Sequence, residues 1–209
     1  MIRIAVADDH AIVRRGLKQI ISETNDLRVT GEAASADELL TLIRSARFDV
    51  VVLDLTLGQR SGIDLLKQVK SECPSLPILI LSMHSEELFA VRALRAGASG
   101  YIQKEEAPDE LVTAIRRIAS GRTYVSAAMS ERLAEELSRG TAPTLPHERL
   151  SDRELDVFRL LGHGNSVSEI AAALNLSVKT VSTHRTRIME KTGFRNNAEI
   201  VHYVITNGL

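Results

Sequence analysis

The chain has 209 residues, 44% of them hydrophobic and 25% charged, with a formal net charge of −1, which is ordinary for a soluble globular protein. The single cysteine, Cys73, excludes an internal disulfide framework and a cysteine-based zinc site. No uncharged apolar stretch approaches the ~20 residues that span a bilayer, and two aspartates stand too close to the N-terminus for a signal peptide. We therefore expect a cytoplasmic protein with no membrane partner.

The first ~120 residues alternate short β-branched runs with amphipathic segments, a pattern that predicts βα units and a parallel sheet. The expected strands are Ile2–Ala7, Arg28–Ala33, Val50–Leu53, Ile78–Leu81 and Gly100–Ile102. The expected helices cover residues 11–22, 36–46, a segment around 65–69, 86–96, and a segment that begins after Pro108. The prediction is an α/β doubly wound, five-stranded parallel sheet.

Polar residues stand where these strands end, namely Asp8, Asp9, Asp54, Ser82 and Lys104. The carboxyl ends of parallel strands open onto one crevice, which is the usual place for ligands and chemistry. Three carboxylates, a hydroxyl and an ammonium gathered there predict a site for a divalent cation and a phosphoryl group. Adjacent aspartates after a strand can also simply cap the next helix, and for Asp8 and Asp9 alone this alternative is equally good.

The predicted chemistry assigns each residue a role. Mg²⁺ (or Mn²⁺) prefers oxygen ligands, so Asp9 and Asp54 are expected to bind the ion directly, Asp8 through a water, and Thr56 through its backbone carbonyl. With the metal bound, Asp54 acts as a nucleophile on a phosphoryl donor and forms an acyl phosphate. Lys104 then pairs with the new dianion, and Ser82 donates a hydrogen bond to it.

After Gly121 the pattern changes. Residues 122–138 are expected to form one more helix, and residues 139–149, RGTAPTLPHER, contain two prolines and a glycine without periodicity, which is typical of a linker. The predicted organisation is a first domain over 1–121, a linker helix and flexible linker over 122–149, and a second domain over 150–209.

The last segment is predicted to be all-α, with four helices. Ser151 and Glu154 fit a capping box at the first, Ser166 or Ser168 begins the second, and Ser177 caps a third that ends at Gly193. Two helices joined by a tight turn over about 166–192 indicate a helix-turn-helix.

Charge is distributed unevenly. Residues 1–148 carry 18 Lys and Arg against 21 Asp and Glu, a net of −3, whereas residues 149–209 carry 8 against 6, a net of +2. Between Lys179 and Arg195 five basic residues stand against Glu190, a local +4. A basic strip on a small module is the pattern expected of a nucleic-acid reader, although charge alone fits a solvated helix face equally well.

The third helix of this segment divides by face. Val178, Val181 and Ile188 are expected on its buried side. The other side is expected to carry Lys179, Ser182, Thr183 and Thr186. The short hydroxyl side chains among them suit contacts with bases in a major groove. Basic side chains are expected to hold phosphates, namely Lys179, Arg185, Arg187 and Lys191.

Four stretches, VADDH (6–10), VVLDL (51–55), ILS (80–82) and GYIQK (100–104), resemble the signature positions of a response-regulator receiver domain, which has a flavodoxin-like fold. The resemblance implies that a sensor histidine kinase phosphorylates Asp54, with Asp8 and Asp9 as the acidic metal pair. It makes Ser82 the switch hydroxyl and Lys104 the phosphate-binding lysine. Tyr101 matches the aromatic residue that turns inward on activation; the alternative is a half-buried tyrosine on an edge strand.

One position departs from that family. Receiver domains commonly carry Met-Pro three and four residues after the phosphorylated aspartate, and this chain has Leu57-Gly58. Glycine removes the rigidity of the proline from the loop beside the metal. The departure concerns the stiffness of the loop and the lifetime of the phosphate, not the chemistry.

Residues 150–209 resemble the LuxR-type DNA-binding module through LSDRELDVFRLL (150–161), EIAAALNLSVKTVSTH (169–184) and IMEKTG (188–193). Ser182 replaces a lysine that is frequent in that family and cannot make the contact of that lysine. In the family the last helix dimerises, which makes candidates of Ile200, Val201, Val204 and Ile205. Packing inside the module itself is the alternative for these residues, above all for Ile200 and Val204.

Together the two resemblances cover the whole chain and imply a NarL/FixJ-type response regulator: phosphorylation switches dimerisation and binding to double-stranded DNA. We do not expect the protein to be an enzyme. A phosphatase of the haloacid-dehalogenase type also uses an aspartate nucleophile with Mg²⁺, but it has a second aspartate where this chain has Thr56. The remaining alternative is a DNA-binding regulator that partner binding controls, without phosphorylation.

Overall fold

The computed structural model describes residues 1–57, 62–83, 86–127, 129–131 and 145–209. The chain divides into two compact units, Met1–Glu135 and Glu136–Leu209, and each is described by itself. No helix in the described ranges is long and apolar enough to cross a membrane.

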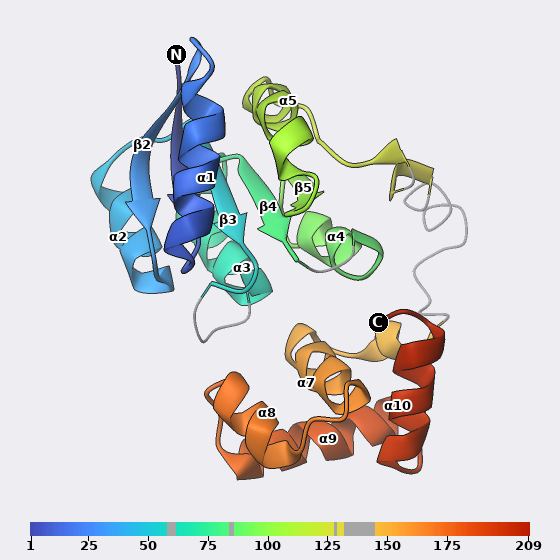
Figure 1. Ribbon diagram of the computed structural model, residues 1–209. Coiled ribbons are helices and arrows are strands. Elements are labelled where there is room, and N and C mark those ends of the chain that lie inside the picture. Colours follow the sequence, from blue (N-terminus) through green and yellow to red (C-terminus); the bar gives the residue numbers. More distant parts are fainter. Residues whose placement is uncertain (58–61, 84–85, 128, 132–144) are drawn as a thin grey trace. The chain divides into compact units, whose positions relative to one another are not determined.

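The first unit is an α/β domain in which every strand is followed by a helix (Figure 1). Its strands are β1 (Ile2–Ala7), β2 (Leu27–Ala33), β3 (Val50–Asp54), β4 (Ile78–Ser82) and β5 (Gly100–Gln103). Its helices are α1 (Ala11–Ser22), α2 (Ala36–Ser45), α3 (Gly62–Glu72), α4 (Glu86–Arg95) and α5 (Ala107–Ala119). All strand pairs are parallel in the order β2-β1-β3-β4-β5, which confirms the predicted doubly wound sheet.

The core of this unit follows from the two-residue period of the strands. One set of strand side chains, including Ile4, Val52 and Leu79, packs against Leu17 of α1 and Leu111 of α5. The alternate residues of the same strands point to the opposite face, along which α2, α3 and α4 lie (Figure 1). Both faces of β3 and β4 are buried, so these strands are continuous apolar runs, and their first polar residues come where the strands end.

The segment after α5 differs from the prediction. Residues 122–126 are not helical; Tyr124 pairs in parallel with Gly100 at the outer edge of β5. The amide of Tyr101 donates to the Tyr124 carbonyl (3.1 Å), and the amide of Tyr124 donates to the Ser99 carbonyl (2.9 Å). A Cβ on Gly100 would lie 2.8 Å from the Tyr124 carbonyl oxygen, so only glycine permits this approach. Of the helix expected over 122–138, residues 127 and 129–131 are helical, and 128 and 132–138 lie outside the described residues.

Over residues 145–209, the described part of the second unit, the structure has four α-helices, as predicted, preceded by a short 3₁₀ turn. These elements are η1 (Pro146–Arg149), α7 (Asp152–Gly162), α8 (Val167–Ala173), α9 (Val178–Thr192) and α10 (Asn197–Thr206). The Ser151–Glu154 capping box is confirmed, Ser166 rather than Ser168 begins α8, and Ser177 caps α9. The α8–α9 pair is the expected helix-turn-helix, and Asn175 takes a left-handed conformation in its turn.

The predicted linker, residues 139–149, extends too far toward the C-terminus. Residues 145–149 belong to the folded helical unit, because His147 is buried and its Nδ1 lies 2.9 Å from the Tyr203 hydroxyl of α10. Residues 139–144 of the predicted linker lie outside the described residues. Composition failed here because residues such as Pro146 and His147 resemble a loop until the packing partner of His147 is known.

Candidate functional site

The five predicted polar residues converge at the carboxyl ends of the strands. Asp8 and Asp9 follow β1, Asp54 and Ser82 are the last residues of β3 and β4, and Lys104 follows β5. Asp8 and Asp54 are each 1% exposed, which is unusual for carboxylates unless they are paired. Asp9 extends toward solvent. The sheet topology therefore places these charges at one edge, as the sequence predicted.

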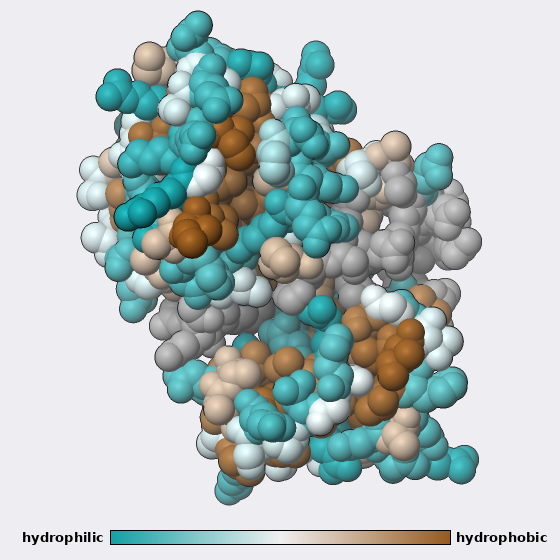
Figure 2. All heavy atoms as spheres, in the orientation of Figure 1, coloured by the Kyte–Doolittle hydropathy of each residue, from teal (hydrophilic) through white to brown (hydrophobic). Residues whose placement is uncertain are grey.

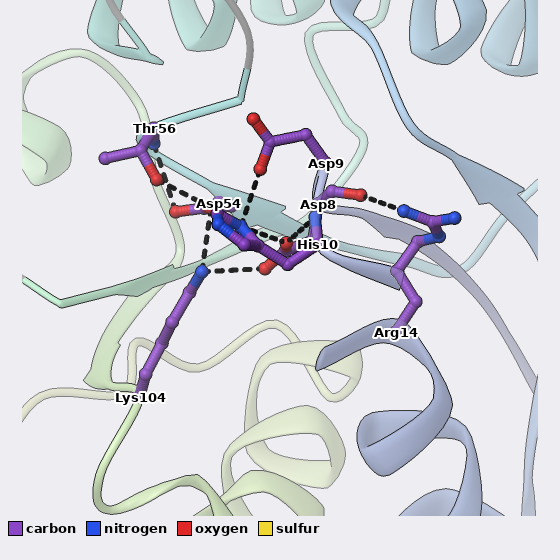
Figure 3. Close-up of polar contacts among 7 residues, drawn as sticks. All are labelled: Asp8, Asp9, His10, Arg14, Asp54, Thr56 and Lys104. Carbon is purple, nitrogen blue, oxygen red and sulfur yellow. Dashed lines mark hydrogen bonds and ion pairs between the residues drawn. The ribbon is translucent and has the colours of Figure 1, made fainter. Parts of the chain in front are cut away.

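Lys104 forms an ion pair with each of the two buried carboxylates (Figure 3). Its Nζ donates to Asp8 Oδ2 at 2.7 Å and to Asp54 Oδ2 at 2.8 Å, and its side chain is 10% exposed. Burial by itself lowers the pKa of the ammonium, but the hydrogen bonds and charges of Asp54 and Asp8 outweigh burial, so the pKa of Lys104 is raised. Lys104 is held charged between the two aspartates.

Asp54 is oriented by Thr56 as well as by Lys104. The amide of Thr56 donates to Asp54 Oδ1 (3.0 Å), and its hydroxyl donates to Asp54 Oδ2 (2.7 Å). Together with Lys104 these donors fix the carboxylate in one orientation. The metal-ligand role of the Thr56 carbonyl stays a prediction.

The sequence reasoning missed His10. Its amide donates to Asp8 Oδ1 (2.7 Å), and its Nδ1 lies 2.7 Å from Asp9 Oδ1 and 3.3 Å from Asp8 Oδ1. Arg14 adds a hydrogen bond to the Asp8 carbonyl (2.6 Å). The pattern of apolar residues gives no signal for this role, because it depends on the hydrogen bond from the His10 amide to Asp8.

The donor set suits a hard divalent cation. Asp8, Asp9, His10 and Asp54 each offer one ligand atom, and these atoms all lie within 4.8 Å of one another. The carboxylate oxygens match the preference of Mg²⁺ or Mn²⁺. The buried charge of this cluster is the physical reason for a cation at this edge of the sheet.

The two predicted switch residues lie on neighbouring strands. Ser82 is fully buried, and its carbonyl accepts a hydrogen bond from the Lys104 amide (2.8 Å). Tyr101 is 1% exposed, so the alternative of a half-buried ring is wrong. Gly58 lies outside the described residues.

In the second unit, α9 presents an exposed polar face. Lys179, Ser182, Thr183 and Thr186 are all exposed, whereas Val181 and Ile188 are buried, as predicted. Val178 was assigned to the wrong side, because it is 51% exposed. At 100° per residue Val178 lies about 70° around the helix axis from Val181 and Ile188.

The predicted phosphate-binding cations differ in their surroundings. Lys179 and Arg187 form no ion pair with the described residues, whereas Arg185 Nε donates to Asn197 Oδ1 (2.8 Å) and Lys191 Nζ donates to Glu154 Oε2 (2.6 Å). Glu154 is 3% exposed, and although burial raises its pKa, the hydrogen bonds from Lys191 and Ser151 lower it overall. Lys191 therefore also holds α9 against α7.

The candidate dimerisation residues of α10 separate into two pairs. Ile200 and Val204 are buried in the unit's own core, so the packing alternative holds for them. A Cβ on Gly162 of α7 would lie 2.3 Å from Val204 Cγ2, which shows how closely the two helices approach. Val201 is half-buried, and Ile205 is 72% exposed. Figure 2 shows hydrophobic side chains gathered on the α10 side of this unit.

Comparison with known proteins finds matches for both units. A family model described as the response regulator receiver domain matches residues 4–116, and one described as bacterial regulatory proteins, luxR family, matches residues 148–204. The chain is 31% identical over 209 residues to the response regulator UvrY of Escherichia coli (strain K12), covering 100% of this chain and 96% of UvrY. It is 36% identical to the oxygen regulatory protein NreC of Staphylococcus aureus (strain JH9), covering 99% and 98% of the two chains.

A solved structure is similar over both units. RcsB from Salmonella enterica serovar Typhimurium, bound to the promoter rprA in the presence of phosphomimetic BeF₃⁻, matches with a TM-score of 0.67 and 29% identity. The match covers 98% of each chain. The similarity therefore extends over the whole length of the protein, not over one domain alone.

Proposed function

The chain belongs to the NarL/FixJ-type response regulators of two-component systems, in which a receiver domain precedes a LuxR-type DNA-binding domain, and on that premise we propose that phosphorylation of Asp54 controls its binding to DNA. As a transcription regulator it combines a signal-receiving unit with a helix-turn-helix unit. A sensor histidine kinase is the proposed phosphoryl donor, and the cytoplasm is the proposed compartment.

The observation that carries the proposal is the bonding of Asp54. Lys104 and Thr56 both donate to Oδ2, and the Thr56 amide donates to Oδ1, so the carboxylate is held at the open end of β3. An oxygen of Asp54 attacks the phosphorus, and the bond from phosphorus to the leaving group breaks with its electrons. Lys104 moves from a carboxylate partner to the phosphoryl oxygens, where its charge opposes that of the phosphoryl group, about −1.5 to −2.

A divalent cation fits beside this residue. Asp9 and Asp54, with Asp8 and the Thr56 carbonyl, are the proposed holders of Mg²⁺ or Mn²⁺. The bound cation supplies charge neutralisation for the transferring phosphoryl group. His10, bonded to both Asp8 and Asp9, keeps these carboxylates in place at the mouth of the site.

The proposed signal passes from Lys104 and Ser82 to Tyr101. These residues lie on or beside β4 and β5, and β5 is hydrogen-bonded to Tyr124, where the chain leaves the receiver. The resulting shift between states is proposed to favour dimerisation through Val201 and Ile205, and contact of α9 with paired DNA half-sites. Base contacts are proposed for Ser182, Thr183 and Thr186, and phosphate contacts for Lys179, Arg185 and Arg187, with Lys191 as a further phosphate contact.

The test is the intact mass of the protein after incubation with Mg²⁺ and acetyl phosphate, beside an Asp54→Asn control. We expect one phosphoryl adduct on the parent and none on the control, and tighter DNA binding by the phosphorylated parent. An unmodified parent, or equal DNA affinity in both states, would contradict the proposal and favour control by partner binding.

A further inference from the structure

The hydroxyl groups on the exposed face of α9 are already engaged as donors. Ser182 Oγ donates to the Val178 carbonyl (2.9 Å), Thr183 Oγ1 to the Lys179 carbonyl (3.0 Å), and Thr186 Oγ1 to the Ser182 carbonyl (3.2 Å). A hydroxyl has one proton and two lone pairs. With the proton directed at the helix backbone, each of these side chains offers only lone pairs to a partner.

This restricts what the three hydroxyls can recognise. In the major groove, donors are presented only by the N6 amino group of adenine and the N4 amino group of cytosine. The N7 and O6 atoms of guanine and the O4 atom of thymine are acceptors, and they repel another acceptor. The hydroxyls of α9 therefore match adenine or cytosine, and they disfavour an approach to the major-groove edge of guanine.

Methyl groups lie beside these hydroxyls on the exposed face of α9. Val178, 51% exposed in the first turn, presents an isopropyl group, and the exposed residues Thr183 and Thr186 each carry a methyl group beside the hydroxyl. Thymine is the base with a methyl group in the major groove. An A·T pair offers both partners at once, the adenine amino group for a hydroxyl and the thymine methyl for an apolar contact.

The beginning of α9 carries few long side chains that can donate hydrogen bonds to a base. Over residues 178–186 the exposed face contains one such side chain, Lys179, which forms no ion pair with the described residues. Arg185 is tied to Asn197. The first two turns of α9 contain no arginine, so the bidentate contact of arginine to guanine, the commonest specific contact to DNA, cannot be made there.

We propose that α9 recognises A·T base pairs through methyl contacts and hydroxyl acceptors, with Val178 as a specificity-determining residue that contacts thymine. The inference rests on the proposed DNA binding and states which bases the same helix reads. Val178 is 51% exposed, so its side chain is available for such a contact.

The experiment selects sites for the full-length protein, incubated with Mg²⁺ and acetyl phosphate, from duplexes with a randomised centre. We expect A·T pairs to dominate the half-site positions under α9. In the selected duplex, replacing single thymidines by deoxyuridine removes one methyl group each. From ~0.8 kcal/mol per buried carbon, each contacted position is expected to weaken binding about fourfold.

Matched variants assign the contacts. Val178→Ala removes the proposed contact group, and Thr183→Ser or Thr186→Ser removes one methyl group while keeping the hydroxyl. Each variant is expected to lose the deoxyuridine effect at one position and to keep it at the others. Circular dichroism checks that α9 remains folded.

Two failures are distinguishable. Selection of half-sites centred on G·C pairs, or specific binding that deoxyuridine leaves unchanged at every position, would overturn this inference while leaving DNA binding in place. Absence of any selected duplex would overturn the DNA-binding proposal itself, and this inference with it.

Discussion

The two units of the protein place their functional charges in opposite environments. In the receiver, Asp8 and Asp54 are buried and both are bonded to Lys104, so these charged groups lie inside the domain. On α9, Lys179 and Arg187 are exposed and free of ion pairs with the described residues, while the hydroxyls between them bond to their own helix. Adding one charge to a buried cluster changes its electrostatic energy strongly. Charges on an exposed face are instead available to a binding partner.

The difference predicts where mutations act. Within the receiver site, a change of charge is expected to alter folding together with the proposed metal binding and phosphoryl uptake, because they depend on the same buried groups. On α9, a change of charge alters DNA binding without altering the fold, since exposed charges contribute little to stability. The following four predictions test this contrast, from the largest expected effect to the smallest.

Lys104→Met is expected to lower the stability of the receiver by about 3–5 kcal/mol in the absence of divalent cations, because it leaves two buried carboxylates unpaired. Hydrogen exchange of the β3 and β4 amides in EDTA measures the loss. Added Mg²⁺ is expected to restore protection more in the variant than in the parent, since the cation replaces the missing charge. Lys18→Met is the control, because its pair with Glu32 is exposed; equal losses in the two variants would refute the contrast.

Gly162→Ala is expected to destabilise the helical unit by about 2–3 kcal/mol, since its Cβ would overlap Val204 and overpacking costs 1–3 kcal/mol or more. Thermal unfolding of the variant measures the effect. Gly164→Ala is a poor control, because the φ of Gly164 is +84° and alanine would be strained there. Ala172→Gly on α8 is used instead, because it exchanges the same two residue types at an exposed position. An unchanged melting temperature in Gly162→Ala would show that α7 and α10 separate readily.

Asp156→Asn is expected to stabilise the helical unit above pH 6 by about 1–2 kcal/mol. Burial raises the pKa of Asp156 to about 6, although Arg153 opposes the rise. Between pH 4 and 6 the folded protein holds a proton that the unfolded chain has released, so this group's contribution to stability falls as pH rises through that window. Urea unfolding at pH 4 and at pH 7 checks this, and a gain that is equal at both values would contradict it.

Lys179→Gln is expected to leave stability within about 0.5 kcal/mol of the parent and to weaken binding to all DNA sequences alike. The slope of log K against log salt is expected to fall by about 0.9, the value for one phosphate contact. Titrations of one duplex at several salt concentrations measure it. Loss of affinity confined to one base sequence would assign Lys179 to base reading instead.

The sequence contained most of the receiver site. Each of its polar residues follows an apolar run, and a parallel sheet brings such strand ends together whatever the details of packing. His10 was missed because its contribution depends on how the backbone turns after Asp9. That turn is set by the hydrogen bond from its amide to Asp8, which no pattern of apolar residues reveals.

The helical unit was predictable in outline but not at its surfaces. Caps such as Ser151 and Ser177 fixed where helices begin, because their side chains bond to specific amides. Exposure of Val178 and burial of Val204 depend on which helix crosses which, and periodicity does not specify that. The same limit applies to Tyr124, whose partner Gly100 lies on a strand formed earlier in the chain.

The pairing of Tyr124 with β5 determines where the receiver can be separated from the rest of the protein. A fragment that stops at Gly121 would leave the outer edge of β5 with unpaired backbone groups, and such edges recruit strands from other molecules. It would also lose the hydrogen bond from the Tyr124 hydroxyl to Glu110 (2.6 Å). Self-association of that fragment would then reflect the position of the cut, and a truncation meant to isolate the receiver should retain residues 122–126.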